Sequence, residues 1–151
     1  MTSATSPNQE LTVYCHQEVI RLSSELLQRL ESAGREALPK ALEVADRPDS
    51  VLSRLDEVEV SFIDDATIAD VHLRFMDIPG ATDVITFDHG EIHISVETAR
   101  RQAAEFGQDF ERELMLYMVH GLLHLAGHED ATDVGRSTMD KLQHSILNQV
   151  W

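Results

Sequence analysis

In the stretch His120-Gly-Leu-Leu-His124-Leu-Ala-Gly127-His128-Glu-Asp130, two histidines lie four residues apart within an apolar run. On an α-helix, residues i and i+4 share a face, so both imidazoles can reach one cation. Gly127 can end this helix in a left-handed turn and bring the following residues back toward the same face. Three or four potential ligands then converge, which is typical of a catalytic zinc site with an open position. A purely structural cluster is less favoured, because burying several imidazoles without partners costs free energy.

Two residues compete for the position of third ligand. Asp130 lies six residues after His124, the spacing at which zincin-type sites take their third ligand, and a carboxylate oxygen is an acceptable zinc donor. His128 is the commoner ligand type, but it follows Gly127 directly and lies close to the turn. We favour Asp130, with His128 as the alternative, and expect one Zn²⁺ per chain. The other residue is expected to form a hydrogen bond to the site or to line the cleft.

The residue after the first histidine excludes one class of enzyme. Zinc proteases of the HExxH type place their general base, a glutamate, directly after the first histidine. This chain has Gly121 there, and a glycine cannot move a proton. Peptide hydrolysis by that route is therefore not expected.

Length and composition are typical of a globular protein. The chain has 151 residues, of which 42% are hydrophobic and 26% charged, enough for one domain with its own core. We expect a disordered tail over residues 1–9 and a single domain over 10–151. One cysteine, Cys15, cannot form an internal disulfide and fits a reducing compartment. Because the start lacks a signal-peptide pattern and no apolar run is long enough to span a bilayer, we expect a cytoplasmic protein without a membrane partner.

The formal net charge of −15 limits how the chain can meet nucleic acid. It would repel a polyanion within about 8–10 Å at physiological salt. A nucleic-acid substrate therefore needs a local positive patch, a bound metal or a partner that delivers it. The alternative interpretation is that the acidity simply keeps the protein soluble.

The hydrophobic pattern predicts an α+β fold, with a single mixed sheet of about four strands covered by helices. Strands are expected over residues 11–15, 57–63, 83–87 and 91–95, the last two forming a hairpin. A first helix over 18–33 is expected to end at Gly34, with a second, shorter helix over 37–45. Further helices are expected over 64–74, 96–106, 111–126 and 132–150.

The histidine stretch resembles the signature HGxLHLxGYDH of the YbeY family of bacterial endoribonucleases. A second block, in which Arg74, Asp77 and Pro79 precede Thr82-Asp83-Val84-Ile85-Thr86-Phe87, resembles the family's R-x-x-D-x-P-T-D-V-L-S-F. Gly90-Glu-Ile-His-Ile-Ser95 then resembles GDIxIS. The similarity runs in order from about Val58 to the C-terminus.

This resemblance implies a zinc-dependent, single-strand-specific endoribonuclease that acts in 16S rRNA 3′-end maturation and ribosome quality control. It also implies a zincin-like metal helix and an important arginine, which corresponds to Arg74 and could clamp a phosphate through two donors. The partners implied are single-stranded RNA or rRNA and the ribosome or its small-subunit proteins, and DNA is not expected. The alternatives are a metallohydrolase of another substrate class and a non-catalytic ribosome assembly factor with a structural metal.

The chain departs from the family pattern around both motifs. Asp130 stands where the family has its third histidine, and His128 where it has tyrosine. The residues Gly80-Ala81 are additional, and Asp70 and Leu73 replace an asparagine and a tyrosine before the arginine. Two neutral imidazoles and one carboxylate would leave a zinc centre at +1 instead of +2, so we expect a less acidified bound water and better tolerance of harder metals such as Mn²⁺.

Overall fold

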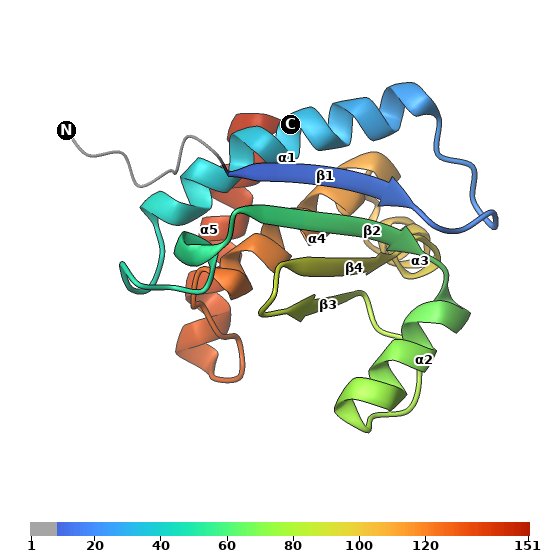
Figure 1. Cartoon of the computed structure of the whole chain (residues 1–151). Helices are drawn as coiled ribbons and strands as arrows, with labels where there is room; N and C mark the ends of the chain where they lie inside the picture. Colours follow the sequence, from blue (N-terminus) through green and yellow to red (C-terminus); the bar gives the residue numbers. More distant parts are fainter. Residues whose placement is uncertain (1–8) are drawn as a thin grey trace.

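A computed structural model describes residues 9–151 of the chain. Its sheet contains β1 (Glu10–Cys15), β2 (Glu57–Ile63), β3 (Val84–Phe87) and β4 (Glu91–Ser95) in the order β1-β2-β4-β3 (Figure 1). β1, β2 and β4 are parallel, and β3 pairs antiparallel with β4 as the predicted hairpin. The prediction of an α+β fold with one mixed sheet is confirmed.

The described residues also form five α-helices and one short 3₁₀ helix (Leu52–Arg54). The α-helices are α1 (Ser24–Glu43), α2 (Asp65–Met76), α3 (Val96–Phe106), α4 (Phe110–Leu125) and α5 (Asp133–Val150). Before each α-helix, a side-chain oxygen accepts a hydrogen bond from a backbone N–H of the first turn, which fixes where the helix begins. These capping residues are Ser23, Asp64, Ser95, Asp109 and Thr132. Within residues 9–151, no helix has the length and apolar character needed to cross a membrane.

The prediction of two short helices in the first third of the chain is wrong. A single helix, α1, starts after the Ser23 cap and continues through Gly34. A Cβ at Gly34 would lie only 2.7 Å from Met118 Cε and 2.8 Å from Leu11 Cδ2. Gly34 therefore allows α1 to pack closely against its neighbours, and tertiary packing outweighs the local tendency of glycine to end a helix.

The predicted tail over residues 1–9 lies outside the described residues except for Gln9. The side-chain amide of Gln9 donates to the carbonyl oxygens of Leu52 and Leu55, both at 2.9 Å. These bonds fix Gln9 to the 3₁₀ helix before β2.

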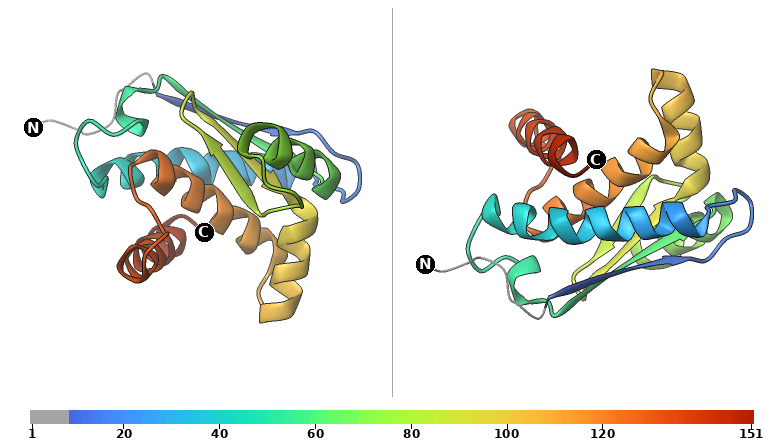
Figure 2. Two further views of the ribbon diagram at one scale, coloured as in Figure 1. Left: turned by 90° about the horizontal axis from the view of Figure 1, so that it is seen from below. Right: turned by 90° about the horizontal axis from the view of Figure 1, so that it is seen from above.

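The helices divide between the two faces of the sheet. α1, α4 and α5 lie on one side and enclose the main core (Figure 2). On the other face, Ile68 of α2 packs with Ile63 and Ile85 in a smaller cluster. α4 lies close to β4, because a Cβ at Gly121 would be 2.8 Å from Ile92 Cγ2. The helix that carries both histidines of the motif is thus held against the sheet, as a precise site requires.

Candidate metal centre

Three potential ligands meet at the C-terminal end of α4. Nε2 of His120 and Nε2 of His124 lie 3.0 Å apart, and Asp130 Oδ2 lies 3.5 Å and 3.8 Å from these two nitrogens. The three donor atoms all lie within 4.8 Å of one another, so this group could hold a metal ion.

The turn after α4 brings Asp130 to the histidines. Gly127 has a φ of 99°, the left-handed conformation expected from its place in the sequence. The backbone N–H of Gly127 donates to the carbonyl oxygen of His124, and that of His128 to Leu123, both at 3.0 Å. These bonds close the helix, and the chain then folds back along its histidine face.

The hydrogen bonds of the two rings fix which nitrogen carries the proton. Nδ1 of His124 lies 2.9 Å from the backbone carbonyl oxygen of His128, which can only accept. Nδ1 of His120 lies 2.9 Å from Oε1 of Gln143 on α5, also an acceptor. Each Nδ1 therefore donates, and each neutral ring has its lone pair on Nε2.

The residues present fit a divalent ion. Two Nε2 lone pairs that face each other at 3.0 Å repel, and a cation between them removes the repulsion. With zinc–nitrogen bonds of about 2.0–2.1 Å, two tetrahedral donors lie about 3.3 Å apart, close to the separation observed. Burial lowers the pKa of His124 and its neighbour His120 lowers it further, which favours the neutral ring that a metal requires.

The alternative third ligand lies elsewhere. Nε2 of His128 is 2.6 Å from the carbonyl oxygen of Val44, just after α1, so its ring is engaged outside the cluster. Its backbone oxygen, however, orients His124. Glu129 is also peripheral, since its side chain is 80% exposed and its Oε2 lies 3.9 Å from His124 Nδ1.

Two cavities border the cluster. One of about 450 Å³ is lined by His120, Asp130 and Arg136 among others, and one of about 350 Å³ by His124, Arg47 and Arg54 among others. The side chains of Arg47 and Arg54 form no ion pair or hydrogen bond with residues 9–151, although Asp49, Asp88 and Glu129 line the same cavity. Sequence reasoning missed these three arginines, because they stand in no motif and only the fold brings them to the histidines.

Comparison with known proteins identifies the family. The model of the family described as Endoribonuclease YbeY matches residues 15–151. The chain belongs to the YbeY family. The Endoribonuclease YbeY of Desulforamulus reducens is 32% identical over 150 residues, covering 89% of this chain and 92% of that protein. That of Desulfitobacterium hafniense is 33% identical over 112 residues, covering 62% of this chain and 71% of that protein.

The fold agrees with this assignment. The solution structure of TM1509 from Thermotoga maritima is similar with a TM-score of 0.65 and 25% identity, over 93% of this chain and 89% of that one. Membership of the YbeY family puts the chain among nucleases that act on RNA phosphodiester bonds.

The arginine of the second YbeY motif lies on a different helix from the histidines. Arg74 lies in the last turn of α2, its side chain is 69% exposed, and its Nη1 is 3.6 Å from Oδ2 of Asp70. An ion pair this exposed contributes little to stability. Arg74 lines neither of the two cavities that border the metal cluster.

Gln143 is a further residue that the motifs did not reveal. It lies 23 residues after His120, and its side chain reaches the ring from α5. Such an outer partner fixes the tautomer and orientation of a metal-binding imidazole. No local pattern marks it, because a single glutamine on an amphipathic helix is normally a surface residue.

Proposed function

We propose that this member of the YbeY family is a zinc-dependent, single-strand-specific endoribonuclease of 16S rRNA 3′-end maturation and ribosome quality control. His120, His124 and Asp130 would hold one Zn²⁺ per chain, and His128 would support His124 through its backbone. The observation that carries the metal site is the pair of Nε2 atoms facing each other at 3.0 Å beside a carboxylate.

The chain supplies most of what such a reaction needs. When bound, zinc would stabilise negative charge on a phosphate oxygen and acidify water at the site. The side chains of His120, His124 and Asp130 are 23%, 21% and 42% exposed, so a polyanion can approach them. Arg47 and Arg54 place two guanidinium groups beside the site, whereas Arg136 is paired with Asp133.

We keep Arg74 as a proposed catalytic residue, on its match to the family motif alone. Its exposed position suits contact with a strand that extends beyond the cluster. Arg74→Glu should then lower RNA cleavage without changing the melting temperature, because the exposed pair with Asp70 contributes little.

The direct test is cleavage of labelled single-stranded RNA and of the matching duplex, with and without a chelator. We expect the single strand to be cut, the duplex to be spared and the chelator to abolish cleavage. His124→Ala and Asp130→Ala should lose both activity and bound zinc. RNA cleavage by a zinc-free Asp130→Ala variant at the wild-type rate would refute the proposal.

The same set of proteins tests the two alternatives. A metallohydrolase of another class would leave RNA intact while cutting casein or a phosphoester in a chelator-sensitive way. An assembly factor with a structural metal would unfold on chelation and would cleave no RNA before or after it. We further propose a cytoplasmic location, one domain over residues 10–151, small-subunit proteins as partners, and no binding to membranes or DNA.

A further inference from the structure

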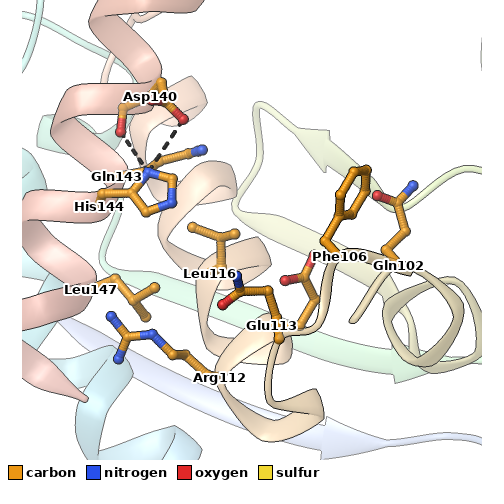
Figure 3. Close-up of a pocket in the computed structure, with 10 residues that line it drawn as sticks. Gln102, Phe106, Arg112, Glu113, Leu116, Asp140, Gln143, His144 and Leu147 are labelled. Carbon is orange, nitrogen blue, oxygen red and sulfur yellow. Dashed lines mark hydrogen bonds and ion pairs between the residues drawn. The ribbon is translucent and has the colours of Figure 1, made fainter. Parts of the chain in front are cut away.

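A cavity of about 620 Å³ opens between α3, α4 and α5 (Figure 3). Its volume falls within the range of about 300–1,000 Å³ that is usual for small-molecule sites. Phe106 and Glu113 lie on one side, and Gln143 and Leu147 of α5 on the other, with Leu116 of α4 between them (Figure 3). None of these residues belongs to the YbeY motifs.

The cavity adjoins the metal cluster. It shares Asp140 and Gln143 with the cavity that His120 and Asp130 line. Oε1 of Gln143 accepts a hydrogen bond from Nδ1 of His120, and the amide nitrogen of Gln143 forms no hydrogen bond with the described residues. That nitrogen can therefore donate to a molecule in the cavity while the oxygen holds the ring.

The lining suits a nucleobase. Phe106 is 63% exposed, although it is large and apolar, and Leu116 and Leu147 add apolar walls. Unpaired bases stack on aromatic side chains. The Glu113 carboxylate can accept from the exocyclic amine of adenine, cytosine or guanine.

The cavity also has a cation for the phosphate. Arg112 lines it and donates to the Asn148 side chain, but forms no ion pair with a carboxylate among residues 9–151. A guanidinium that keeps its charge can contact a phosphate with two donors.

We propose that this cavity binds one unpaired nucleotide of the RNA strand, next to the phosphodiester at the His120/His124/Asp130 cluster. Phe106 stacks on the base, Glu113 and Gln143 contact its edge, and Arg112 contacts its phosphate. A base held in a duplex cannot enter a space between three helices, so the cavity selects single strands. This proposal rests on the proposed ribonuclease function, and it adds the residues that recognise the strand.

The test measures, by fluorescence anisotropy, how tightly the full chain binds a fluorescent eight-nucleotide RNA without secondary structure. EDTA is present so that the RNA is not cleaved. Phe106→Ala should weaken binding by roughly five- to one-hundredfold, because stacking on one ring is lost. The matched control is Tyr14→Ala, which removes a ring that is 38% exposed on β1, outside the cavity and away from α2, and should leave the affinity unchanged. Thermal unfolding verifies that both variants fold.

A second series locates the nucleotide, using RNAs that each carry one abasic position. We expect one position to weaken binding to the wild type and to have no effect on Phe106→Ala, and cleavage by the zinc-loaded wild type to occur within one nucleotide of it. Equal RNA affinity of Phe106→Ala and wild type would overturn the proposal, as would an equal loss of affinity in Tyr14→Ala. An equal loss of affinity for duplex RNA in Phe106→Ala would also overturn it. Failure of the wild type to cut any RNA would instead refute the ribonuclease function, and the anisotropy series would still decide whether the cavity binds a base.

Discussion

Replacing Gln143 by leucine should weaken zinc binding about tenfold. The change removes the acceptor that lies 2.9 Å from Nδ1 of His120 and leaves that ring free to protonate Nε2, the atom that faces His124. Loss of such an outer partner costs about 10- to 100-fold in metal affinity. The lower value applies because the His120 side chain is 23% exposed and water can replace part of the bond. His124 keeps its own partner, which is a backbone oxygen.

Zinc affinity can be measured by competition with a chromophoric chelator at pH 7. Gln143→Glu should bind zinc as tightly as wild type or more tightly, because a carboxylate is a stronger acceptor for Nδ1. Gln149→Leu is the matched control, since Gln149 lies on the same helix but bonds only to Ser145. Equal zinc affinity of Gln143→Leu and Gln149→Leu would refute the role given to Gln143.

Three further predictions test the site and the fold. Asp130→Ala should lower zinc affinity by more than the tenfold expected when Gln143 is replaced by leucine. Glu129→Ala, which alters an 80% exposed side chain, should leave zinc affinity unchanged. Elemental analysis after dialysis measures the zinc content of both variants. Gly121→Glu, which completes the HExxH pattern, should lower the free energy of unfolding by at least about 3 kcal/mol, as measured by urea unfolding. The reason is that a Cβ there would lie 2.8 Å from Ile92 and the added carboxylate would be buried. The variant should show no casein hydrolysis. Asp65→Asn should cost about 1.5–3 kcal/mol at pH 7, measured by urea unfolding. Burial raises the pKa of Asp65, but hydrogen bonds from hydroxyl groups and the Arg101 guanidinium outweigh burial and hold this pKa below its usual value. The stability that the ionised Asp65 contributes is therefore lost as the pH falls below about 4, and the difference between Asp65→Asn and wild type shrinks there.

Most of the fold, and the cluster of His120, His124 and Asp130 that could hold a metal, could be predicted from local patterns because both depend on short spacings. The i, i+4 histidines, the glycine turn and the alternating strands each involve neighbouring residues, and the hairpin and helix caps follow the same logic. Gly34 shows the limit. Its place in the middle of α1 depends on Met118 and Leu11, which are distant in the sequence, so no local rule distinguishes it from a helix terminator.

The surroundings of the site were beyond sequence reasoning for the same reason. Gln143 and Arg136 reach the cluster or its cavity from α5, and Arg47 reaches a cavity beside the cluster from the segment after α1. Only the packing of these two segments against α4 brings them there. Arg74, in contrast, was found through its sequence motif and not through its surroundings. The motif predicts a role in the reaction, and the structure shows Arg74 on α2, exposed and paired with Asp70.

The support that α5 gives to His120 has a thermodynamic counterpart. An ion held by α4 and the following turn would favour the arrangement in which Gln143 also touches the ring, so occupancy and docking of the last helix would be linked. Binding of the ion to the native state and not to the unfolded chain would by itself stabilise the native state by about 2.7 kcal/mol at a free ion concentration 100 times the dissociation constant. The supply of metal would then govern how long the protein survives proteolysis in the cell, as well as whether it can act.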